Sequence, residues 1–167
     1  GLDRRRHFAF DKADNESPIL TDLTGDGKPE LLCNSEGHVV YASPNWKKPT
    51  DPWTIHRISA KGKWQKYTHG IGHGDVSGDG RPDVILREGW WEQPADLKGD
   101  PEWKFHPFAF GTGGAQMYAY DVNGDGLNDI VTSLAAHGYG LAWYEQVRDE
   151  ATITFKPHIV INSKPTD

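Results

Sequence analysis

Short apolar stretches alternate with turns rich in glycine, proline, aspartate and asparagine along the chain. Short runs of β-branched and aromatic residues bounded by such turns are typical of β-strands, and no long helical pattern interrupts them. The pattern predicts three groups of four strands. These are residues 18–23, 30–35, 38–43 and 53–59, then 71–76, 83–88, 89–93 and 103–110, and finally 116–122, 129–135, 141–146 and 153–161.

One nonapeptide occurs three times, at the same point of each group. Residues 22–30 read DLTGDGKPE, residues 75–83 read DVSGDGRPD and residues 121–129 read DVNGDGLND. Two aromatic markers recur in the same order. They are the aromatic-x-x-His pairs Trp53/His56, Trp103/His106 and Phe155/His158, and the clusters at Tyr41, Trp90-Trp91 and Trp143-Tyr144. Because the three histidines recur in step, we expect them to be structural and to hold outer strands.

Four strands in a unit of about 50 residues match one blade of a β-propeller. We therefore predict an all-β fold made of four-stranded antiparallel propeller blades. Three blades, at 18–59, 71–110 and 116–161, follow one orphan outer strand at 4–10. The whole of 1–167 is then a partial propeller.

The nonapeptide carries oxygen side chains at positions 1, 3, 5 and 9, and glycine at position 6. Alternate oxygen side chains, a backbone carbonyl at position 7 and a glycine for the sharp turn are the features of a calcium loop. The alternative is an Asx-rich hairpin turn without metal. The predicted ligands, with Lys28, Arg81 and Leu127 acting through their carbonyls, are Asp22, Thr24, Asp26, Lys28 and Glu30; Asp75, Ser77, Asp79, Arg81 and Asp83; and Asp121, Asn123, Asp125, Leu127 and Asp129.

Composition and charge exclude several classes of protein. The net charge of −6 argues against a nucleic-acid partner, and the three nonapeptides hold nine of the 24 acidic residues. No apolar run approaches the ~18 residues that would span a membrane. A single cysteine, Cys33, excludes an intramolecular disulfide and a cysteine-based zinc cluster.

The blades resemble FG-GAP and VCBS-type repeats, the calcium-loop propeller repeats of integrin α-subunit heads and many secreted bacterial proteins. The resemblance covers residues 4–162 and rests on the motif D-x-[TSN]-G-D-G-x-x-[DE]. It implies three Ca²⁺ sites and a secreted or periplasmic location. It also implies that each metal loop joins the innermost strand to the next, opposite the usual ligand face. The integrin Phe-Gly…Gly-Ala-Pro signature is absent, so a cell-adhesion role is not implied.

Propellers close with roughly 4–8 blades, so three blades and one strand cannot close a ring. We expect the remaining blades to come from a longer parent chain or, alternatively, from other copies.

The segments on the face opposite the calcium loops differ between the repeats, which is expected where function is added to a scaffold. This face, together with the resemblance to calcium-loop propellers, implies two alternative functions. One is a recognition module that binds carbohydrate or protein. The other is the propeller of a carbohydrate-active enzyme, of polysaccharide lyase or sugar dehydratase type. The candidate ligand-binding residues are Trp64, Tyr67, His69, Arg87, Glu88, His137 and Tyr139, and the candidate catalytic residues are His69, His137, Tyr139 and Arg87.

Overall fold

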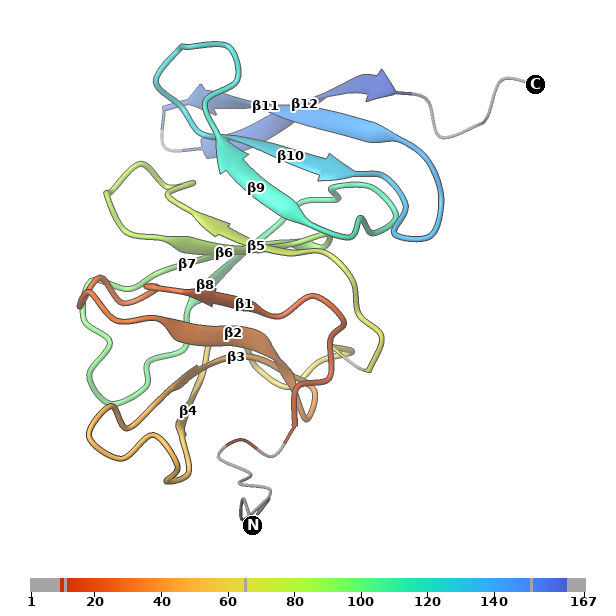
Figure 1. Ribbon diagram of the computed structural model, residues 1–167. Helices are drawn as coiled ribbons and strands as arrows, with labels where there is room; N and C mark the ends of the chain where they lie inside the picture. The colour runs from red at the N-terminus through yellow and green to blue at the C-terminus, as the bar shows by residue number, and fades with distance from the viewer. Residues whose placement is uncertain (1–9, 11, 65, 151, 162–167) are drawn as a thin grey trace.

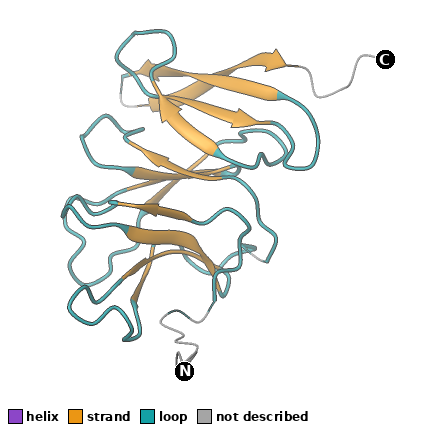
Figure 2. Cartoon of the chain, viewed as in Figure 1, coloured by secondary structure: helices purple, strands orange, loops and turns teal. Residues whose placement is uncertain are grey.

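The computed structural model describes residues 10, 12–64, 66–150 and 152–161. This part of the chain is all β, with strands joined by turns and loops and with no helix (Figure 2). It therefore contains no helix long and apolar enough to cross a membrane. The orphan strand predicted at 4–10 lies outside the described residues except for Phe10, which is not in a strand.

In the described part of the chain, twelve strands form three four-stranded antiparallel sheets, each a simple meander in chain order. This confirms the predicted grouping of the strands. Sheet 1 contains β1 (Ile19–Thr21), β2 (Glu30–Ser35), β3 (His38–Ser43) and β4 (Thr54–Arg57). Sheet 2 contains β5 (Ile71–Gly74), β6 (Asp83–Leu86), β7 (Gly89–Glu92) and β8 (Lys104–Pro107). Sheet 3 contains β9 (Met117–Tyr120), β10 (Asp129–Ser133), β11 (Leu141–Asp149) and β12 (Thr152–Ile161).

The three sheets stack face to face in chain order (Figure 1). One hydrophobic core lies between sheets 1 and 2 and includes Leu32, Tyr41 and Trp91. A second core lies between sheets 2 and 3 and includes Trp90 and Tyr144. Each sheet of the stack is thus held by apolar side chains of its neighbour.

The first strands of sheets 2 and 3 approach each other closely. A Cβ atom at Gly72 would lie 2.4 Å from the carbonyl oxygen of Met117, and one at Gly74 would lie 2.5 Å from the Cβ of Ala119. Only glycine fits at these two positions of β5. The close approach brings the loops at both ends of β5 and β9 near one another.

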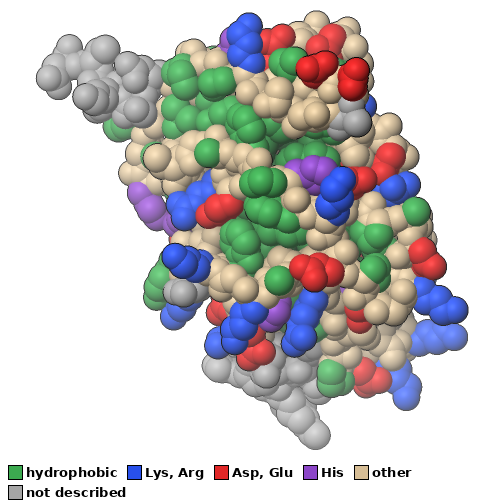
Figure 3. All heavy atoms as spheres, turned by 180° about the vertical axis from the view of Figure 1, so that it is seen from behind, with side chains coloured by type: hydrophobic (Ala, Val, Ile, Leu, Met, Phe, Trp, Pro, Cys, Tyr) green, Lys and Arg blue, Asp and Glu red, His purple; other side chains and the backbone are tan. Residues whose placement is uncertain are grey.

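The two outer faces of the stack expose apolar side chains. Tyr118 and Tyr120 of β9 are 60% and 66% exposed on the face of sheet 3 that points away from sheet 2. Leu20 of β1 is 61% exposed at the opposite end, on sheet 1. Figure 3 shows from behind that hydrophobic side chains also gather in a band across the surface of the molecule.

Candidate functional site

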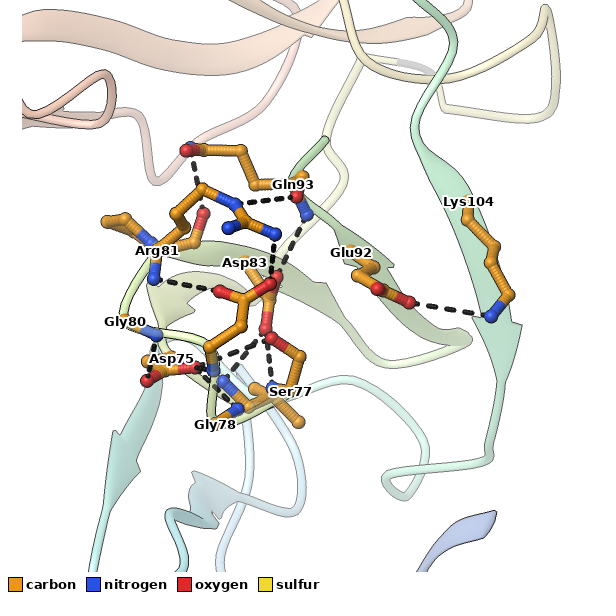
Figure 4. Close-up of polar contacts among 12 residues, drawn as sticks. Asp75, Ser77, Gly78, Gly80, Arg81, Asp83, Glu92, Gln93 and Lys104 are labelled. Carbon is orange, nitrogen blue, oxygen red and sulfur yellow. Dashed lines mark hydrogen bonds and ion pairs between the residues drawn. The ribbon is translucent and has the colours of Figure 1, made fainter. Parts of the chain in front are cut away.

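Each nonapeptide forms the loop between the first two strands of its sheet. In the second loop, Asp75 Oδ1 accepts hydrogen bonds from the N–H groups of Gly78 (2.6 Å) and Asp79 (3.0 Å), and Oδ2 accepts one from Gly80 (2.8 Å) (Figure 4). Gly78 and Gly80 have φ values of 79° and 85°, which favour glycine. The motif's glycines and its first aspartate therefore fix one compact turn.

The other two loops repeat this arrangement. Asp22 accepts hydrogen bonds from the N–H groups of Gly25 and Gly27, both at 2.9 Å. Asp121 accepts them from Gly124 at 2.7 Å and Gly126 at 2.9 Å. One turn geometry is therefore built three times from one sequence pattern.

The acidic residue at position 9 closes each loop from inside the protein. Asp83 Oδ2 accepts hydrogen bonds from the N–H groups of Val76 (2.9 Å) and Ser77 (2.7 Å). Burial raises the pKa of Asp83 to about 6 in spite of these bonds, and burial also raises the pKa of Glu30. Asp129 is fully buried and accepts a hydrogen bond from the N–H of Val122 at 3.0 Å. The carboxylates of Asp83 and Glu30 are desolvated, and a bound cation would favour their charged form.

The carboxylate at position 5 turns toward neighbouring side chains. Asp26 lies 3.5 Å from the ammonium group of Lys28, and Asp79 pairs with the guanidinium group of Arg81. In the third loop, the amide of Asn123 donates to Asp125 Oδ2 at 2.9 Å. The remaining predicted ligands lie in the same loops, namely the hydroxyl side chains of Thr24 and Ser77 and the backbone of Leu127.

Two buried glutamines tie the loops of adjacent sheets together. Gln93 Nε2 donates to the carbonyls of Leu23, in the first nonapeptide loop (2.8 Å), and Pro82 (3.0 Å). Gln146 Nε2 donates to the carbonyls of Val76, in the second nonapeptide loop (3.1 Å), and Asn128 (2.7 Å). Sequence reasoning missed both residues, although their shared context, WWEQ and WYEQ, was a usable signal.

The opposite ends of the sheets bring together His69, which precedes β5, and His137, from the loop between β10 and β11. Their Nε2 atoms lie 3.0 Å apart, and the rings meet edge to face with centroids 4.7 Å apart. Glu16, which the sequence analysis did not select, places Oε2 3.5 Å from His69 Nε2. No repeated pattern in the sequence marks this contact, because it depends on backbone hydrogen bonds between residues 14–16 and 67–68.

A cavity of about 250 Å³ lies beside His69. Its lining includes the candidates Tyr67 and Arg87 together with Lys63 and Lys66. Arg87 is held by the carbonyl of Thr112 at 2.8 Å, while its Nε also donates to Glu88 at 2.6 Å. Cationic side chains therefore dominate the charged lining of this cavity, and Tyr67, which also lines it, has a strained φ of 70°.

Two further candidates on this face are Trp64 and Tyr139. The indole of Trp64 packs edge to face on the buried Trp91, with ring centroids 5.2 Å apart. Tyr139 is 62% exposed in the loop that carries His137.

The recurring histidines stack on the aromatic residue of the neighbouring strand. His106 lies on Trp90 with ring centroids 4.0 Å apart, and its Nε2 lies 2.8 Å from Glu92. His158 makes the same contacts with Trp143 and Glu145. His56 stacks on Tyr41 and pairs with Asp100 of the next unit, because residue 43 is a serine where the other sheets have a glutamate. These contacts hold outer strands.

Comparison with known proteins found no match for this chain among protein-family models, curated proteins or solved structures.

Proposed function

We propose that this chain is a calcium-stabilised β-propeller recognition module of the FG-GAP/VCBS type, from a secreted or periplasmic protein. The observation that carries the proposal is the loop geometry that recurs between the first two strands of every sheet. Each loop offers carboxylate, hydroxyl or amide oxygens, which are the ligands that Ca²⁺ prefers.

Calcium fits the donor set of these loops. A carboxylate oxygen that accepts an N–H bond, as Asp75 does, keeps a lone pair for a cation. The carboxylates of Asp26 and Asp79 would turn from Lys28 and Arg81 toward the centre of the loop. The ion would then offset the charge that accumulates in each loop and the desolvation of its buried position-9 acid.

Thermal unfolding with excess Ca²⁺ and with excess chelator tests this proposal. Each occupied site is expected to add about 2.7 kcal/mol at a Ca²⁺ concentration of 100 times Kd. Asp125→Asn should reduce the gain, whereas Asp149→Asn, an exposed acid outside the loops, should leave it unchanged. An equal melting temperature in calcium and chelator would refute the proposal.

Further sheets of the same kind are proposed to pack on the exposed end faces. In sheet 2, Ile85 and the stacked pair Trp90–His106 face sheet 3. The equivalent pair of sheet 3, Trp143–His158, faces away from the stack. Within the described residues, Trp143 Nε1 is buried and has no hydrogen-bond partner. A following sheet, from a longer chain or another copy, would cover this face.

The ligand of the module is proposed to be a carbohydrate or protein that contacts the face with the basic cavity. Arg87, Lys63 and Lys66 favour an acidic group, and Arg87 can donate two parallel hydrogen bonds to a carboxylate. Galacturonate oligomers should bind more tightly than galactose oligomers. Arg87→Ala should remove this preference, and Arg57→Ala, on β4 outside this cavity, should retain it.

The second candidate function is the propeller portion of a polysaccharide lyase or sugar dehydratase. The contact between His69 and His137, beside Tyr67 and Arg87, favours it. A neutral histidine could accept a proton from the sugar, a tyrosine could donate one, and Arg87 could neutralise the carboxylate. An unsaturated sugar product that His69→Ala and His137→Ala abolish would support this function, and tight binding without turnover would exclude it.

A further inference from the structure

Glu16, His69 and His137 form a group of metal-ligating side chains at the end of the sheets opposite the nonapeptide loops. Their ligand atoms all lie within 4.8 Å of one another. Among the residues that the structure describes, no other three His, Cys, Asp or Glu side chains meet this criterion. The acidic side chains of the nonapeptide loops therefore do not meet this criterion. The group of Glu16, His69 and His137 differs from those loops both in its position and in its nitrogen ligands.

The backbone holds the three residues near one another. The N–H of Glu16 donates to the carbonyl of Thr68 at 3.2 Å, and the N–H of Tyr67 donates to the carbonyl of Asp14 at 3.0 Å. These bonds place the segment of Glu16 beside the segment of His69. The loop that carries His137 is fixed separately, because the N–H of Ala136 donates to the carbonyl of Gly113 at 3.0 Å.

The two imidazole nitrogens are arranged as they would be around one ion. At 3.0 Å, the Nε2 atoms of His69 and His137 must share a proton or a cation, since two lone pairs facing each other repel. With Zn–N distances of about 2.0–2.1 Å and a tetrahedral angle, two zinc-bound nitrogens lie about 3.3 Å apart. Replacing the shared proton with a metal therefore requires only a small movement of the rings.

We propose that Glu16, His69 and His137 bind Zn²⁺ through one carboxylate and two imidazole Nε2 atoms. Two nitrogens and one oxygen suit zinc, whereas Ca²⁺ takes oxygen ligands almost exclusively. Glu16 and His137 are exposed and His69 is partly so, so the ion can enter from solvent. Three protein ligands leave a coordination position open, as in catalytic zinc sites.

The open coordination position and the charges around it indicate which class of ligand the site would bind. Zn²⁺ with one carboxylate keeps a net positive charge, and His69 also lines the cavity with Lys63, Lys66 and Arg87. An anionic oxygen, such as a sugar carboxylate, fits these charges. This part of the proposal rests on the ligand face proposed above, whereas zinc binding itself does not depend on calcium in the nonapeptide loops. Zinc-bound His69 and His137 would not be free to act as proton acceptors.

Titration with Zn²⁺ in the presence of excess Ca²⁺ tests the site, because calcium then masks the acidic loops. We expect one Zn²⁺ per chain. His137→Ala should weaken binding at least about 100-fold, since losing even an outer partner of a metal ligand costs about 10–100-fold. Glu16→Gln should weaken it as well. The matched controls His158→Ala and Glu36→Gln should bind like the wild type.

Co²⁺ provides a second readout, because visible absorption bands of a four-coordinate ion should appear in the wild type and disappear in His137→Ala. Melting curves and a separate Ca²⁺ titration of each variant establish that it is folded and that the loops are intact. Zinc affinity that His137→Ala leaves unchanged, or zinc that excess Ca²⁺ displaces, would overturn the proposal. If the calcium proposal is wrong, the separate Ca²⁺ titration will show no binding, whereas the effect of His137→Ala on Zn²⁺ binding will remain.

Discussion

Replacement of Gln146 by methionine should destabilise the protein by about 2–4 kcal/mol. The substitution keeps the volume of the side chain and removes its amide, which donates to the carbonyls of Val76 and Asn128 and accepts from Arg148 Nε at 2.9 Å. Each buried polar group left without its partner costs about 1–3 kcal/mol. The carbonyl of Val76 keeps a hydrogen bond from Arg148 at 3.3 Å. The expected loss is therefore smaller than the sum of the largest penalties for all the groups that lose a partner.

Urea unfolding followed by tryptophan fluorescence, in a fixed excess of Ca²⁺, measures this loss. Gln93→Met, at the equivalent position between sheets 1 and 2, should show a loss of similar size. Gln116→Met is the control, because Gln116 is exposed and its change should stay within about 0.5 kcal/mol. If Gln146→Met is no more destabilising than Gln116→Met, the glutamines do not hold the sheets together.

Three other predictions follow from the described contacts. Burial raises the pKa of the Cys33 thiol to about 12, so iodoacetamide at neutral pH should label it only after unfolding; labelling of the native protein would contradict its burial. The hydrogen bond with His106 lowers the pKa of Glu92 below 4.5, so its contribution to stability is complete above that pH and is lost as the pH falls through the lowered value. In urea unfolding at a series of acidic pH values, Glu92→Gln should reduce the loss of stability that accompanies the fall in pH. An unchanged dependence of stability on pH would exclude the Glu92–His106 pair as its source. Arg87→Ala should weaken ligand binding with little loss of stability, whereas Asp79→Ala should lower the melting temperature in Ca²⁺ first; an unfolded Arg87→Ala variant would make Arg87 structural.

The arrangement of strands could be predicted because the nonapeptide marks the same turn in every sheet. The apolar runs form groups of four when the nonapeptides at 22–30, 75–83 and 121–129 are taken as equivalent positions. Strand ends were less predictable. The hairpin of β11 and β12 extends to Asp149, beyond the predicted end at 146, because cross-strand backbone pairing continues through residues 147–149, which are exposed and show no alternation of buried and exposed positions.

The candidate site could be predicted in part. His69 and His137 were selected because they break the repeat, and the structure places them in contact. Glu16 was missed because its role depends on pairing between residues 14–16 and 67–68, which no periodic pattern encodes. Trp64 was predicted to bind ligand, yet its ring packs on the buried Trp91 at the edge of the core between sheets 1 and 2.

The number of calcium ions bound per chain tests the central claim most directly. Native mass spectrometry or equilibrium dialysis should find three Ca²⁺ in the wild type and two in a variant in which Asp121 and Asp125 are both replaced by asparagine. The third loop is suited to this test because its acids make no salt bridge with a lysine or arginine within the described residues. No bound Ca²⁺, or three in both proteins, would contradict the assignment of the nonapeptide as a calcium loop.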